Sequence, residues 1–217
     1  MIERAFEEAR LHRENKELHR ENKDSIIKFA IDQAVARRPQ TAAESLYFIP
    51  EGVGVRSSLD IGGKPVDQLA ADAKRVRTLS GYALDMMHNP KFTTLEEVTP
   101  QELIKLRVQD LGLTGTPTTT EVFERATHSR IGNTALELCR AEVGPHQAIA
   151  DTEQPLNDWY YIAHKPITDR DGDPSVFGLE RNAGGLWLDG RWAKPDYGWR
   201  PGDRLVFALR NIESVKA

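Results

Sequence analysis

The chain has very little cysteine: Cys139 is the only one among its 217 residues. A single thiol excludes an internal disulfide framework and excludes structural zinc sites that need several cysteines at close spacing. Long apolar runs are also missing. The stretch from Met1 to Lys28 is crowded with charge, without the apolar core of a signal peptide or the roughly 20 apolar residues of a membrane span. We therefore expect a soluble, cytoplasmic protein that does not enter a membrane.

An excess of positive charge is absent as well. The chain has 29 Lys and Arg against 33 Asp and Glu, a net charge of −4, and no segment concentrates the basic residues. Proteins that bind nucleic-acid backbones usually gather Lys and Arg on one face. Nucleic-acid binding is therefore not favoured, and we keep it only as the last of three functional hypotheses.

A seven-residue echo is the first organised feature, because Leu11-His-Arg-Glu-Asn-Lys16 recurs as Leu18-His-Arg-Glu-Asn-Lys23. Seven residues is the coiled-coil period, and leucine at d with asparagine at a favours parallel two-stranded coils. The echo indicates that residues 1–38 form a charged helix that dimerises the chain. The alternative is a charged, solvated helix that packs only through its later part, since a coiled coil usually needs three or four heptads.

Residues 39–133 are predicted to be mainly helical, after one or two short strands between Glu44 and Lys64. Helices are expected over Val66–Arg77 and Ser80–His88. Two further helices are marked by capping signals, Thr99-Pro-Gln-Glu102 and Thr118-Thr-Thr-Glu121, in which a hydroxyl and a carboxylate satisfy free amides of the first turn. The first of these would bury Leu103, Leu106 and Leu111. The pair could form a helix-turn-helix, but an ordinary helical hairpin fits the weak positive charge better.

Residues 134–217 are predicted to form an antiparallel β module, because short apolar runs alternate with turn-forming residues. The predicted strands are Leu136–Val143, Trp159–Lys165, Val176–Arg181, Gly185–Asp189 and Arg204–Arg210. The last strand is expected to be central, since apolar side chains point to both of its faces. The fold class that follows is α+β, with a helical N-terminal half and a mostly antiparallel sheet after it.

All four tryptophans lie in this C-terminal region. Clustered aromatic side chains either fill a small core or form a surface that stacks on a ligand. The sequence leaves both alternatives open. If a binding surface exists, the best candidates for it are Trp187, Trp192, Tyr197 and Trp199.

A weaker signal is carried by Asp169-Arg-Asp-Gly-Asp173, which resembles part of a calcium loop. Asp169, Asp171 and Asp173 could converge on a cation, but the glycine position and the missing terminal glutamate depart from an EF-hand. A solvated turn is the favoured interpretation, and no cofactor is expected. Cys139 with Glu142, His146 or His164 gives no complete catalytic group, because no third orienting residue can be named.

Several segments resemble a group of uncharacterised bacterial proteins, over roughly residues 46–210. The resemblance implies no activity, ligand or catalytic residue, and the chain departs from it at Arg140, where proline is expected. It is carried by six segments: Thr118–Ala126, Leu136–Cys139, Ala141–His146, Gln154–Leu156, Pro166–Asp169 and Gly185–Leu188.

The leading functional hypothesis is a non-catalytic binding or assembly module with an aromatic-rich β surface for an unidentified protein or small ligand. The first alternative is a metal-assisted hydrolase or nuclease that uses the three aspartates with His146 or His164. The two differ in geometry: the enzyme needs these carboxylates and imidazoles to converge in one hollow.

Overall fold

The computed structural model describes residues 45–212, and the predicted N-terminal coiled coil lies outside them. The described part contains four α-helices, one 3₁₀ helix and eleven strands in a single mixed sheet. The helices are α2 (Val66–Val76), α3 (Gly81–His88), η1 (Val108–Leu111), α4 (Thr119–Thr127) and α5 (Val143–Ala150). The strands are β1 (Tyr47–Phe48), β2 (Val55–Ile61), β3 (Thr78–Leu79), β4 (Thr99–Arg107), β5 (Ser129–Ile131), β6 (Thr134–Glu137), β7 (Asp158–Ile162), β8 (Ile167–Thr168), β9 (Pro174–Asn182), β10 (Gly185–Trp192) and β11 (Arg204–Asn211).

Strand β11 joins the sheet together. It pairs antiparallel with β4 and β6 and parallel with β7. From β7 the sheet continues through β9 and β10 to β3, and β4 carries β2 on its other side. The prediction that this last strand is central is therefore confirmed. Its residues 205–209 are all buried, as expected of a strand covered on both faces.

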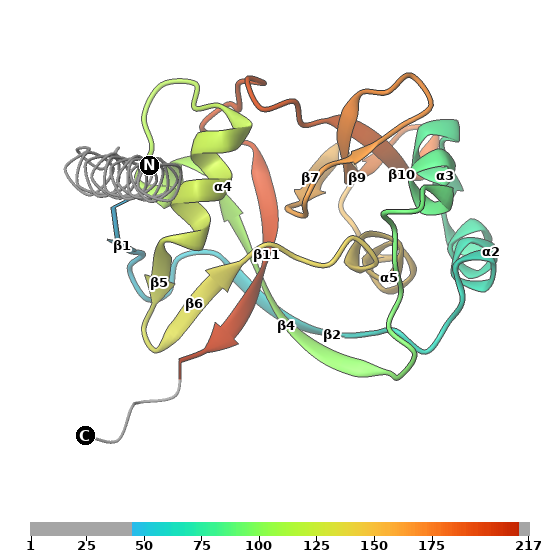
Figure 1. The fold of residues 1–217 in the computed structure, drawn as a ribbon, viewed down its shortest axis with the longest axis horizontal. Helices are drawn as coiled ribbons and strands as arrows, with labels where there is room; N and C mark the ends of the chain where they lie inside the picture. Colours follow the sequence, from blue (N-terminus) through green and yellow to red (C-terminus); the bar gives the residue numbers. More distant parts are fainter. Residues whose placement is uncertain (1–44, 213–217) are drawn as a thin grey trace, which may run out of the picture. The chain divides into compact units, whose positions relative to one another are not determined.

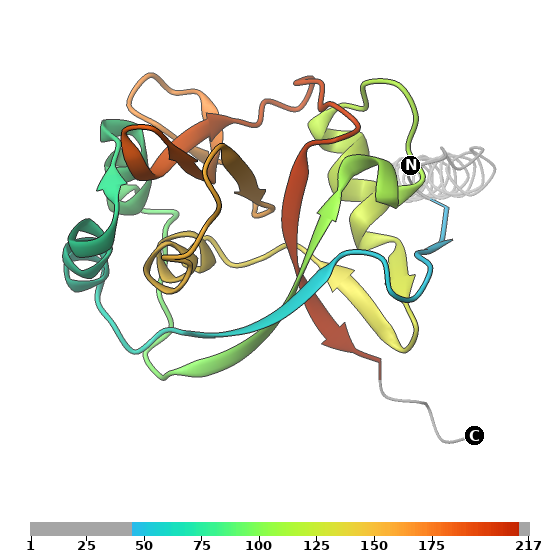
Figure 2. The same ribbon diagram turned by 180° about the vertical axis from the view of Figure 1, so that it is seen from behind.

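The helices cover the two ends of this sheet. Helix α4 lies at one end and α2 and α3 lie at the other, while α5 lies next to α2 and contacts β2, β9 and β10 (Figures 1 and 2). Each end has its own apolar core, one around Trp199 and Phe207 and the other around Met86 and Phe177. None of the helices between Ser45 and Ile212 is long and apolar enough to cross a membrane.

The expectation of a helical N-terminal half is wrong. Helices and strands alternate along the described chain, and the region predicted to be mainly helical supplies β1 to β5 to the sheet. The clearest error is at Thr99, where the capping signal predicted a helix and the structure has β4. Leu103 and Ile104 of β4 pair with both β2 and β11, so burial between two neighbouring strands prevails over a local capping signal.

Other local signals give the expected elements. The Thr118 hydroxyl accepts a hydrogen bond from the Glu121 amide, and the Glu121 carboxylate accepts one from the Thr118 amide at the start of α4. At the start of α3 the Ser80 hydroxyl accepts a hydrogen bond from the Ala83 amide. The strand predicted over Leu136–Val143 is partly wrong, because β6 ends at Glu137 and Val143 begins α5.

Candidate functional site

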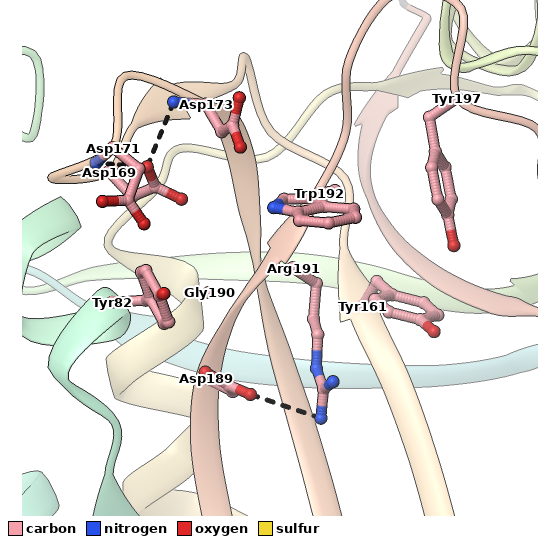
Figure 3. Close-up of a pocket in the computed structure, with 10 residues that line it drawn as sticks. All are labelled: Tyr82, Tyr161, Asp169, Asp171, Asp173, Asp189, Gly190, Arg191, Trp192 and Tyr197. Atoms are coloured by element: carbon pink, nitrogen blue, oxygen red, sulfur yellow. Dashed lines mark hydrogen bonds and ion pairs between the residues drawn. The ribbon is translucent and has the colours of Figure 1, made fainter.

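A hollow of about 380 Å³ opens where β10 ends, between α3 and the loop that follows β8 (Figure 3). We call it the Trp192 pocket. It joins segments that lie far apart in the sequence, and it contains two of the predicted aromatic candidates together with all three predicted aspartates. Its lining residues are Tyr82, Tyr161, Asp169, Asp171, Asp173, Asp189, Gly190, Arg191, Trp192 and Tyr197.

One wall of the pocket is aromatic. Trp192 is 58% exposed and Tyr197 is 37% exposed, so both rings can contact a ligand. Behind them Trp199 is only 1% exposed, and its Nε1–H donates to Thr119 Oγ1 at 3.0 Å. Tyr161 and Tyr197 pack edge-on against the Trp199 ring, with centroids 4.9 and 5.3 Å away. Trp199 is therefore a core residue that supports the wall, which excludes it as a stacking surface.

The opposite wall is a turn built around Asp169. One carboxylate oxygen of Asp169 accepts hydrogen bonds from the amides of Asp171 and Asp173, and the other accepts one from the Ser175 hydroxyl. Gly172 closes the turn with φ of +80°, a conformation that favours glycine. This network holds the Asp169 carboxylate in the turn and fixes where the other two aspartates lie.

The three aspartates are engaged in different ways. Asp173 forms an ion pair with Lys194 at 2.9 Å, whereas the carboxylate of Asp171 faces the Tyr82 hydroxyl and raises the pKa of Tyr82. Within residues 45–212, no group of three His, Cys, Asp or Glu side chains is placed to hold a metal ion. The turn thus presents negative charge to the pocket as separate carboxylates.

Cations of the chain itself already lie over the aromatic rings. The Lys194 ammonium lies 5.4 Å from the centre of the Trp192 ring while it contacts Asp173. That ion pair raises the pKa of Lys194, so this side chain is firmly charged. The Arg170 guanidinium lies 5.6 Å from the centre of the Tyr82 ring and pairs with Asp85. Both arrangements are cation–π geometries.

The floor of the pocket is set by Arg191. Its guanidinium forms ion pairs with Glu180 at 2.6 Å and with Asp189 at 3.3 Å. Arg191 is the one cation among the lining residues, which include four aspartates. The stem of Arg191 crosses Gly178 on the neighbouring strand, where a Cβ atom would lie 2.7 Å from Arg191 Cγ. Gly178 therefore allows Arg191 to lie flat on the sheet.

A second, smaller hollow of about 220 Å³ adjoins the first and shares Tyr161 and Arg191 with it. Its exposed aromatic residue is Trp159, which is 47% exposed and which the sequence did not single out. Alternation along β7 could have indicated it, because Trp159 and Tyr161 point to one face while Tyr160 and Ile162 are buried. Tyr82 carried no such signal, since α3 brings it to the pocket. Trp187, a predicted candidate, lines neither hollow.

The predicted nucleophile and imidazoles lie away from the Trp192 pocket. Burial strongly raises the pKa of Cys139, and its thiol donates to the Val206 carbonyl. His164 is buried, accepts from the Phe177 amide through Nε2 and contacts the Lys165 carbonyl through Nδ1, and desolvation lowers its pKa to about 4. His146 accepts from the Gly62 amide, and burial also lowers its pKa. These groups hold backbone segments together.

Comparison with known proteins identifies no relative of this chain. No protein-family model, no curated protein and no solved structure matches the chain. The resemblance to uncharacterised bacterial proteins stays a prediction.

Proposed function

We propose that this protein is a non-catalytic binding module that takes up an organic cation, such as an alkylammonium group, in the Trp192 pocket. The observation that carries the proposal is the position of Lys194. Its ammonium lies over the Trp192 ring and against the Asp173 carboxylate, so the chain itself supplies an example of the group that this pocket holds. An aromatic face beside a carboxylate is the usual environment for binding such a cation.

Charge and size support the same ligand class. Four aspartates and one arginine line the pocket, and Lys194 pairs with only one of the aspartates, so carboxylates remain in excess and the pocket attracts cations and repels anions. A volume of about 380 Å³ is in the lower range of small-molecule sites, which run from about 300 to 1,000 Å³. A single ammonium group with a short organic body, or one basic side chain of a partner protein, matches these dimensions.

The alternatives have less support. A hydrolase or nuclease would need an imidazole near the carboxylates, but both ring nitrogens of His164 and the Nε2 of His146 contact backbone groups. A nucleic acid would bring phosphates to a hollow whose lining includes four aspartates, which is electrostatically unfavourable. Cation recognition needs only the groups that the pocket presents.

The proposal is tested by NMR titration with tetramethylammonium and with N-acetyl-lysine methylamide. The four tryptophan indole N–H signals are assigned by single Trp→Phe variants. The Trp192 signal should shift in a saturable way, while the signal of buried Trp199 should stay in place. Acetate serves as the anionic control and should cause no saturable shift.

Two variants sharpen the test. Trp192→Ala should abolish the binding of both cations, whereas Trp159→Ala removes a similarly exposed tryptophan from outside the pocket and should leave it unchanged. Unaltered cation binding by Trp192→Ala would overturn the proposal, as would the absence of any saturable shift in the parent protein.

A further inference from the structure

A third pocket lies among the loops beside β8, and its charge is opposite to that of the Trp192 pocket. It has a volume of about 530 Å³, and we call it the Arg140 pocket. Its lining residues are Lys91, Thr93, Leu138, Cys139, Arg140, Ala141, Lys165, Pro166 and Ile167. Three of these are cations and none is a carboxylate. By contrast, the hollows around Trp192, Trp159, Ser57 and Asp158 each have at least one Asp or Glu in their lining.

Arg140 is held in place from behind. Its Nε donates to Glu142 Oε1 at 2.7 Å, and its Nη2 donates to Thr93 Oγ1 at 3.3 Å. The Glu142 side chain is fully buried and also accepts from the Leu95 amide, so its carboxylate is a fixed anchor. A guanidinium has five N–H donors, and the two bonds leave the other three free to bind an anion.

The two lysines are free to meet a ligand. Lys91 and Lys165 are both exposed, and neither side chain has an ion-pair or hydrogen-bond partner among residues 45–212. They come from different loops, one after α3 and the other between β7 and β8, so the fold brings together three cations from three separate segments. Mutual repulsion of these cations is relieved when an anion binds between them.

We propose that the Arg140 pocket binds a phosphate monoester attached to a small apolar body. The dianionic phosphate would accept hydrogen bonds from Arg140 and from the two lysines, which are charge-assisted and therefore among the stronger ones. Leu138, Ala141 and Pro166 are half-buried and supply apolar surface beside these donors. This site is separate from the Trp192 pocket, and the proposal does not depend on cation binding there.

Phenyl phosphate is the probe, and isothermal titration calorimetry at low salt measures its affinity. It should bind more tightly than inorganic phosphate, because only the ester has an apolar body, and phenol should not bind. Raising the NaCl concentration should weaken the binding, because salt screens exposed charges. Addition of phenyl phosphate should leave the indole N–H signal of Trp192 in place, which separates this site from the proposed cation site.

The decisive variant is the double change Lys91→Gln with Lys165→Gln. Neither lysine has a partner in the described chain, so the melting temperature should not change. The affinity for phenyl phosphate should fall at least about tenfold, given what charge-assisted hydrogen bonds contribute. Lys74→Gln is the matched control, since Lys74 is an exposed lysine on α2 outside the pocket, and it should bind like the parent protein.

Three results would overturn the proposal: no saturable binding of phenyl phosphate at concentrations up to about 10 mM, equal affinities of the double variant and the parent protein, or an equal loss in Lys74→Gln. Arg140→Lys keeps a cation beside Glu142 but loses the planar guanidinium. It should weaken the binding of phenyl phosphate without unfolding the chain.

Discussion

Trp199 should be the most costly tryptophan to remove, although its sequence context suggested an exposed ring. The side chain is 1% exposed, contacts Tyr161 and Tyr197 edge-on, and donates to the hydroxyl of Thr119. Truncation of a buried tryptophan to alanine costs about 3–5 kcal/mol, through lost apolar burial and the cavity left behind. Since small proteins are stable by about 5–15 kcal/mol, Trp199→Ala should remove a large share of the free energy of unfolding.

Urea denaturation followed by far-ultraviolet circular dichroism measures this loss without relying on tryptophan fluorescence. Trp159→Ala is the matched control because its ring is 47% exposed, and it should cost about 1 kcal/mol or less. If Trp199→Ala costs no more than Trp159→Ala, the assignment of Trp199 to the core is wrong.

A double-mutant cycle isolates the hydrogen bond inside this cluster. Trp199→Phe keeps a ring against Tyr161 and Tyr197 but loses the indole N–H, and Thr119→Val removes the acceptor with little change of shape. The two changes should couple by about 1 kcal/mol, the usual net contribution of a hydrogen bond. A coupling energy indistinguishable from zero would show that the 3.0 Å contact contributes no stability.

Three further predictions concern single positions. The pKa of His164 falls from 6.5 to about 4 on folding, so between these pH values the unfolded chain binds one more proton than the folded chain. The free energy of unfolding should therefore fall by up to about 1.4 kcal/mol per pH unit as the pH drops from 6.5 toward 4. Denaturation of His164→Gln at several pH values should lack this pH-dependent contribution. Gly144→Ala places a Cβ 2.7 Å from the Phe177 ring and should cost about 1–3 kcal/mol, which an unchanged melting temperature would contradict. Lys194→Met removes the resident cation from Trp192 and should raise the affinity for tetramethylammonium about threefold to tenfold; a lower affinity in the NMR titration would mean that the two cations do not compete.

The sequence predicted elements whose determinants are local. Helices α4 and α3 begin after Thr118 and Ser80, because each of these hydroxyls accepts a hydrogen bond from the backbone amide three residues later. The same kind of signal at Thr99 was misleading, because β4 is determined by pairing with β2 and β11, whose paired residues lie 38–50 and 97–105 positions away in the chain. A cap contributes about 1 kcal/mol, and burial of Leu103 and Ile104 between two strands contributes more.

The candidate site was predictable to a similar extent. Trp192 and Trp199 were predicted to be exposed because they lie in an irregular, proline-containing stretch, where side chains often stay exposed. Trp199 lies in the same stretch but reaches the core, because it packs against Tyr161 of β7 and donates to Thr119 of α4. The joining of Trp192 with the Asp169 turn depends on how β8, β9 and β10 pair, which no local pattern reveals.

The central place of β11 affects how the chain can fold during synthesis. This strand is synthesised after every other strand of the sheet, yet β4, β6 and β7 each pair with it along one edge. While the ribosome is still adding residues 204–211, those three strands have exposed edges, and exposed edges invite pairing with other chains. Nascent chains that stall before Arg204 should therefore be the species most in need of a chaperone.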